Sequence, residues 1–158
     1  TRRLFFIELT GNYNRYSAPS IRSASLGPPD DETMILLDCA DATLEKLFEL
    51  AKPGVPVCDV TREVTEHARS KLKGLTEPRT HYGYSVGIGF PPDWVEHAMY
   101  IHEGEKRPLE AGMTFHFPVV YFIPEKGVNA YYSDTWVVTE SGGVPLTRMP
   151  RELVMLDR

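Results

Sequence analysis

The sequence lacks the features that mark nucleic-acid-binding and membrane-spanning chains. Its 17 Lys and Arg residues are outnumbered by 22 Asp and Glu residues, and no basic tract interrupts the net charge of -5. Nucleic acid is therefore not an expected partner. No apolar run reaches the roughly 18 residues that a membrane span needs, so no membrane segment is expected. The two cysteines, Cys39 and Cys58, have neither CxxC nor zinc-site spacing. This favours reduced thiols in a cytoplasmic protein over a disulfide framework.

The composition is that of one ordinary globular domain. The chain has 158 residues, of which 42% are hydrophobic, and this length suits a single domain over residues 1–158. An apolar strand over residues 4–9, a turn at Gly11-Asn12 and a partner strand over residues 13–26 predict an N-terminal hairpin.

Two helices and further strands are expected after the hairpin. Helical periodicity predicts one helix from Asp30 or Asp31 to Pro53-Gly54, and a second from near Asp59 to Gly74. Strand-like runs follow at residues 82–90, 114–123 and 134–139. Because strands and helices do not alternate, the order of elements favours an α+β fold over a doubly wound sheet.

The stretch HYGYSVGIGFPPDW, from His81 to Trp94, contains three glycines among aromatic residues. A phosphate-binding loop would require a different glycine spacing and a helix start, whereas here two prolines follow and no lysine is present. Glycines spaced in this way within a strand instead allow another backbone or a ligand to approach closely.

Several stretches in order resemble the creatinase/aminopeptidase, or pita-bread, family over essentially the whole chain. They are IELTGNYNRYSAPSIRSASLG, AKPGVPVCDV, YGYSVGIGFPPDW, PLEAGMTFHF and SDTWVVTESGGVPLT. Within the family, the elements ELTG, RY, PPDW and GMTFHF look most like the ectoine hydrolase branch, which opens a small cyclic amidine. The resemblance implies a pita-bread α+β fold in which this chain is the C-terminal part of the catalytic domain and lacks the first helical half.

The resemblance also implies five ligands for two divalent metals: two aspartates on the hairpin, a histidine in the glycine-rich strand and glutamates on the last two strands. The corresponding residues of this sequence are Glu8, Pro19, Val86, Pro118 and Ser133. Proline and valine side chains supply no donor, and a dinuclear site needs about five or six oxygen or nitrogen donors. We therefore expect no metal and no other cofactor.

Glu8 is the remaining carboxylate and the first catalytic candidate. If it is buried in its apolar strand, its raised pKa suits acid/base or nucleophilic work. Alternatively, it is exposed or paired with Arg15 or Arg22. His116 in GMTFHF is the second catalytic candidate, and the alternative is a hydrogen-bonded structural histidine.

The substrate-binding candidates are two basic or aromatic residues of the hairpin, two aromatic residues of the glycine-rich stretch and two polar residues of the last strand. These are Tyr16, Arg22, Tyr84, Trp94, Ser133 and Asp134. Arg22 would bind a substrate carboxylate, or else form a salt bridge with Glu8. Tyr84 and Trp94 would face a delocalised cation, or else pack in the core. Ser133 and Asp134 would reach the site, or else form the ordinary start of a strand.

Thr1 has two interpretations, an N-terminal nucleophile or the boundary of a fragment, and the resemblance favours the boundary. Because the resemblance implies a missing half-domain beside the hairpin, we expect a homodimer or association with a missing segment.

These observations predict a metal-independent hydrolase of a carbon–nitrogen bond in a small, charged, non-peptide substrate. One alternative is a peptidase of the Xaa-Pro type, which would require the metal ligands. The other is a catalytically inactive binding module, favoured if Glu8 is exposed and no enclosed pocket exists.

Overall fold

The computed structural model describes residues 3–90 and 92–156, and Thr1 lies outside these ranges, so its two interpretations stay open. The elements in chain order are β1 (Arg3–Tyr13), β2 (Tyr16–Leu26), α1 (Asp31–Leu50), α2 (Val57–Leu72), β3 (His81–Val86), β4 (Val95–His102), β5 (Thr114–Ile123), the short 3-10 helix η1 (Pro124–Lys126), β6 (Val128–Thr139), β7 (Gly142–Pro145) and β8 (Val154–Leu156).

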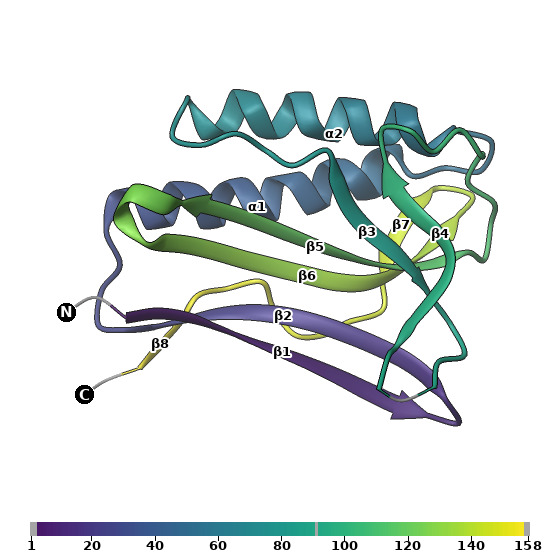
Figure 1. The fold of residues 1–158 in the computed structure, drawn as a ribbon, viewed down its shortest axis with the longest axis horizontal. Helices are drawn as coiled ribbons and strands as arrows, with labels where there is room; N and C mark the ends of the chain where they lie inside the picture. The colour runs from purple at the N-terminus through teal and green to yellow at the C-terminus, as the bar shows by residue number, and fades with distance from the viewer. Residues whose placement is uncertain (1–2, 91, 157–158) are drawn as a thin grey trace.

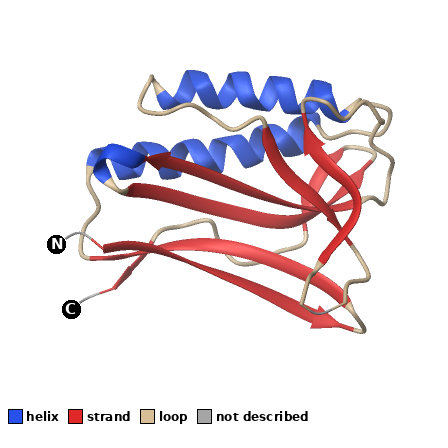
Figure 2. Ribbon diagram, in the orientation of Figure 1, coloured by secondary structure: helices blue, strands red, loops and turns tan. Residues whose placement is uncertain are grey.

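The strands form one sheet, and both helices lie on the same side of it (Figures 1 and 2). The strand order is β1-β2-β6-β5-β3-β4, with β7 paired to β6 and β8 paired in parallel to β2. The β1–β2 hairpin lies on the other side of β5 and β6 from the helices (Figure 1). Hairpin, helices and strands follow one another as the α+β expectation requires.

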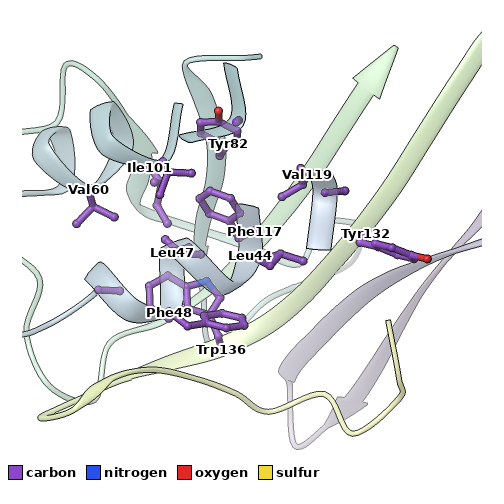
Figure 3. Close-up of a cluster of buried hydrophobic side chains, with 14 of the residues drawn as sticks. Leu44, Leu47, Phe48, Val60, Tyr82, Ile101, Phe117, Val119, Tyr132 and Trp136 are labelled. Atoms are coloured by element: carbon purple, nitrogen blue, oxygen red, sulfur yellow. The ribbon is translucent and has the colours of Figure 1, made fainter. Parts of the chain in front are cut away.

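Helix α1 begins where the sequence predicts, because the Asp30 side chain accepts a hydrogen bond from the Thr33 backbone N–H. The helix ends at Leu50, just before Pro53. Helix α2 follows Pro56. Their apolar faces pack on the sheet, where Leu44, Leu47, Phe48 and Val60 of the helices meet Ile101, Phe117, Val119 and Trp136 of the strands (Figure 3).

The hairpin turn differs from the expected one. Residues Asn14 and Arg15, with φ of 49° and 72°, form the two-residue turn, and Gly11 lies within β1. Two positive φ values are the requirement of the primed turns that match strand twist, and Asn tolerates this conformation well. The Gly-Asn pair at 11–12 was therefore the wrong turn signal. β1 continues to Tyr13, farther than expected, and β2 begins at Tyr16, three residues later than expected.

The later strands agree with the sequence in part. β5 covers residues 114–123 as expected, whereas β3 ends at Val86 and β6 begins six residues earlier than expected, at Val128. The sequence did not predict β4, because its first half is exposed or half-buried and polar residues interrupt its apolar pattern. Both cysteines are free thiols within the helices. Among the described residues, no helix is long and apolar enough to cross a membrane.

The hairpin carries large apolar side chains that the rest of the described chain leaves uncovered. Ile7 is 50% exposed and Leu9 is 61% exposed, and they lie two positions apart on the edge strand β1. Their spacing puts both side chains on one face of the strand. An uncovered strand edge with an apolar face tends to pair with another surface.

We predict that the chain self-associates through β1. Sedimentation velocity at micromolar concentration should show a species heavier than a monomer, and the Ile7→Ser/Leu9→Ser variant should shift it toward the monomer. Val144→Ser, at a 42% exposed residue of β7, is the matched control and should leave the distribution unchanged. A well-folded monomer of the parent chain would contradict the prediction.

Candidate functional site

A chain of hydrogen bonds crosses three strands on the sheet face away from the helices. His116 on β5 is fully buried, and its Nδ1 lies 2.8 Å from the Tyr84 hydroxyl on β3. The His116 Nε2 lies 2.6 Å from the Ser133 Oγ on β6. The Trp94 Nε1–H donates to the Tyr84 hydroxyl at 2.8 Å. The structure thus brings together four of the predicted site residues, from three separate stretches of sequence.

Burial keeps His116 neutral. Desolvation lowers its pKa from 6.5 to about 3. Because the Tyr84 oxygen already accepts from Trp94, the donor pattern favours donation of the Tyr84 proton to His116 Nδ1. The Nε2–H then donates to Ser133. A histidine this weakly basic is poorly suited to general-base work at neutral pH, so the geometry favours the hydrogen-bonded role of His116 over the catalytic one.

Glu8 lies on β1, opposite Ile21 of β2, and its side chain is exposed. Of the alternatives, exposure is therefore the one observed, and among the residues that the structure describes Glu8 forms no ion pair with Arg15 or Arg22. Nearby protein atoms nevertheless remove enough water from the carboxyl to raise its pKa. Burial raises the pKa of Tyr84, the Trp94 hydrogen bond lowers it, and the charge of Glu8 raises it further. Glu8 thus acts electrostatically on the cluster formed by Tyr84, Trp94, His116 and Ser133, which we call the His116 cluster.

The five positions where the resemblance implies metal ligands do not supply a ligand set. Pro19 and Val86 are buried, and neither side chain has a donor atom. Pro118 pairs with Ser133 across β5 and β6, and the Ser133 hydroxyl is hydrogen-bonded to His116. Within residues 3–90 and 92–156, no group of three or more His, Cys, Asp or Glu side chains could hold a metal ion. Two divalent metals do not fit these residues.

Arg22 is used in the fold and not as a free carboxylate-binding group. Its five N–H groups donate to the carbonyl oxygens of Ile21, Ser133, Met149 and Pro150 and to one carboxylate oxygen of Asp134. The second oxygen of Asp134, which is 1% exposed, accepts from Arg151 at 2.7 Å. Arg22 thus forms a salt bridge, as the second alternative predicted, but its partner is Asp134 and not Glu8. Arg22 thus has no N–H left for a substrate, and Asp134 is buried with both of its oxygens bound to arginines.

A cavity of about 460 Å³ lies beside the His116 cluster, between the tip of the β1–β2 hairpin and strands β3, β5 and β6. Tyr16, itself 59% exposed, contributes to its wall. The lining residues are Gly11, Asn12, Tyr13, Tyr16, Ser17, Ala18, Val86, Gly87, Thr114, Thr135 and Leu146. Thr135 faces His116 directly across β5 and β6. The cavity and the cluster therefore adjoin on one face of the sheet.

Sequence reasoning missed three residues that shape this region. Thr114 and Thr135 line the cavity, and their hydroxyls donate to the carbonyl oxygens of Val86 and Pro19. Arg151 completes the ion pair with Asp134. A threonine is common in strands, so its presence there does not indicate a site. The position of Arg151 depends on contacts with Asp134 and with Asp41, which lies 110 residues away in the sequence.

The neutral His116 should make the stability of the protein depend on pH. Its native pKa lies below the unfolded value of 6.5, so between these values the unfolded state binds the extra proton. Its contribution is therefore fully present above pH 6.5 and is lost as the pH falls toward 3.

The free energy of unfolding should fall by about 2 kcal/mol between pH 7.5 and pH 5, because each pH unit below the unfolded-state pKa of His116 lowers it by about 1.4 kcal/mol. Urea unfolding at the two pH values checks this. In the His116→Gln variant, which keeps a polar side chain, the fall in the free energy of unfolding between the two pH values should be about 2 kcal/mol smaller than in the parent. Equal losses in the two proteins would show that His116 is not the group responsible.

Comparison with known proteins gives relatives of two kinds. An ectoine hydrolase from Halomonas elongata is 33% identical over 148 residues, which are 94% of this chain and 36% of that protein. A probable dipeptidase PepE from Mycobacterium tuberculosis is 30% identical over 155 residues, covering 95% of this chain and 38% of that protein. The chain thus spans little more than a third of the length of these relatives.

Solved structures share the fold. The X-Pro aminopeptidase of Thermotoga maritima superposes with a TM-score of 0.84 at 22% identity, over 97% of this chain and 41% of that one. The dipeptidase PepE of Mycobacterium ulcerans gives a TM-score of 0.81 at 25% identity, over 98% of this chain and 40% of that one. The expected pita-bread fold is confirmed. The family model for metallopeptidase family M24 matches residues 1–140, and the chain therefore belongs to this creatinase/aminopeptidase family.

Proposed function

We propose that the protein is a metal-independent hydrolase of a carbon–nitrogen bond in a small, charged, non-peptide substrate, of which a cyclic amidine of the ectoine type is the leading candidate. The observation that carries this proposal is the donor chemistry at the five ligand positions. Proline or valine occupies three of them, and the hydroxyl of Ser133 is bound to a neutral histidine. The name of the relative from Halomonas elongata supports the substrate class.

Glu8 is the group to which we assign the chemistry. Its raised pKa makes it a better proton acceptor than an ordinary carboxylate. In hydrolysis, Glu8 would take a proton from water as the water oxygen bonds to the substrate carbon, and return it to the nitrogen as the carbon–nitrogen bond breaks. Attack by the carboxylate itself on that carbon, followed by water, is the second route. The cavity beside the His116 cluster, of about 460 Å³, has room for a small cyclic substrate, and β1 carries both Glu8 and part of its lining, from Gly11 to Tyr13.

The Tyr84 and Trp94 rings would provide the aromatic side of the site. Both are half-buried and are held together by the Trp94 Nε1–H bond to the Tyr84 hydroxyl. An aromatic face next to a carboxylate favours a delocalised cation such as an amidinium. A second copy or another segment that covers the hairpin would exclude water from Glu8 and raise its pKa further.

Two other functions remain as alternatives. An Xaa-Pro type peptidase is suggested by the dipeptidase relatives, but the donor set opposes it. A catalytically inactive binding module is favoured by the exposure of Glu8 and opposed by the adjoining cavity.

Glu8→Gln separates the enzyme from the binding module. The amide keeps the shape of the side chain but removes the basic oxygen, so turnover of ectoine should fall by about 10²- to 10⁴-fold while binding persists. Initial rates and calorimetric binding of ectoine measure the two effects. Glu63→Gln, at an exposed carboxylate of α2, is the control and should retain full turnover. Unchanged turnover in Glu8→Gln would remove Glu8 from the mechanism, and a parent that binds without turnover would favour the binding module.

Metal removal should have no effect. After dialysis against a strong chelator, elemental analysis should find no stoichiometric zinc, manganese or cobalt, and both activity and melting temperature should match the untreated protein. Loss of activity that returns on adding one of these metals would establish metal dependence and favour the peptidase alternative.

A further inference from the structure

A second cavity lies away from the candidate site, between α1, β6 and the C-terminal segment. Its volume is about 400 Å³. The lining residues are Pro29, Met34, Leu37, Asp38, Asp41, Tyr132, Arg151, Glu152, Leu153 and Met155. None of them belongs to the His116 cluster, so the chemistry of this cavity is independent of the proposed hydrolysis.

The hydroxyl of a largely buried tyrosine opens onto this cavity. Tyr132 is only 3% exposed, and its ring packs beside the core while its oxygen points away from the core cluster (Figure 3). Among the described residues, no group forms a hydrogen bond with this hydroxyl, although the hydroxyls of Tyr121, Tyr82 and Tyr84 all have partners. The ring of Tyr132 is fixed by packing while its hydroxyl has no partner within the described part of the chain, so the hydroxyl is available to a ligand group in the cavity.

The charges at the cavity are mostly negative. Asp38 and Glu152 are exposed carboxylates, and neither has a cationic partner among the residues that the structure describes. Arg151 is the one positive group in the lining, and it is already bound to Asp41, Glu45 and Asp134. Burial raises the pKa of Tyr132 to about 12, and the charges of Asp41, Asp38 and Glu152 add to this rise, while Arg22 lowers it. These three carboxylates therefore act on the neutral phenol from around the cavity.

The remaining walls are apolar and contain two thioethers. Met34 and Leu37 come from α1, and Leu153 and Met155 from the C-terminal segment. Apolar walls suit the hydrocarbon part of a ligand, and flexible methionines adapt to its shape. A hydrated divalent cation would gain nothing from such walls. An anion would meet two unpaired carboxylates and an arginine that is already bound.

We propose that this cavity binds a small organic cation, a protonated amine or a guanidinium with a short apolar body. Its N–H groups would donate to the Tyr132 hydroxyl and to the carboxylates of Asp38 and Glu152, and its hydrocarbon part would lie against Met34 and Met155. The combination of an available hydroxyl on a fixed ring, unpaired carboxylates and apolar walls is what this ligand class requires.

The test is a calorimetric titration of the 158-residue chain with n-butylammonium and n-butylguanidinium, compared with n-butanol and butyrate at matched ionic strength. We expect saturable one-to-one binding of the cations, about tenfold tighter than butanol, and no binding of butyrate. Tyr132→Phe removes only the hydroxyl and should weaken cation binding about five-fold. Asp38→Asn/Glu152→Gln should weaken it about tenfold or more.

Glu66→Gln is the matched control, because Glu66 is an exposed carboxylate on α2, outside the cavity. It should leave cation binding unchanged, and thermal unfolding should show that all variants are folded. The proposal is overturned if butanol binds as well as the cations, if no saturable binding occurs, or if Glu66→Gln weakens binding as much as the cavity variants. Binding of Mg²⁺ or Ca²⁺ at the cavity in place of the organic cations would overturn it equally.

Discussion

The fold depends on one buried carboxylate that two arginines share. Asp134 on β6 binds Arg22 of β2 through one oxygen, at 2.8 Å, and Arg151 through the other, at 2.7 Å. Arg22 also binds carbonyl oxygens at Met149 and Pro150, and Arg151 reaches Asp41 and Glu45 on α1. The hairpin, the central strand, the C-terminal segment and the first helix are thus joined at one point. Removal of one partner of a buried ion pair typically costs about 3–5 kcal/mol, because the remaining charge is left unpaired.

This ion-pair network also positions the candidate site. The backbone pairing of β2 with β6 includes the pair Ile21 and Ser133, and Arg22 adds a hydrogen bond to the Ser133 carbonyl oxygen at 2.6 Å. Successive side chains of a strand point to opposite faces, so Ser133 reaches His116 while Asp134 reaches the arginines. One residue, Ser133, therefore has its backbone in the structural network and its hydroxyl in the His116 cluster. Of these two adjacent residues of β6, Asp134 has a structural role and the Ser133 side chain belongs to the candidate site.

The sequence predicts what depends on local periodicity. Both helices, the Asp30 cap and the bounds of β5 follow from spacing and capping rules, and the structure confirms them. The hairpin turn was misplaced because a Gly-Asn pair is a stronger local signal than Asn14-Arg15, although strand register selected the latter.

The sequence identified residues of the candidate site, but it did not predict the partner of Arg22 or the environment of Glu8. Residue chemistry singled out Tyr84, Trp94 and His116, the resemblance singled out the position of Ser133, and the four side chains do meet. The partner of Arg22 lies 112 residues away, and no local pattern distinguishes that contact from a pair with Glu8. The exposure of Glu8 likewise depends on what packs over β1, which the strand's own alternation does not determine.

The absence of carboxylates at Pro118 and Ser133 favours the neutral form of His116. The backbone at two of the five ligand positions takes part in the fold, because the carbonyl oxygens of Pro19 and Val86 accept hydrogen bonds from Thr135 and Thr114. The fold therefore does not need ligand side chains there. A glutamate at either Pro118 or Ser133 would place a negative charge beside the imidazole and favour its protonated form. With proline and serine at these positions, desolvation is the cause that lowers the His116 pKa. A site without those carboxylates holds its histidine as a neutral hydrogen-bonding group, and we therefore assign the acid/base chemistry to a carboxylate outside the cluster, Glu8, whose charge, like that of Asp93, acts on Tyr84.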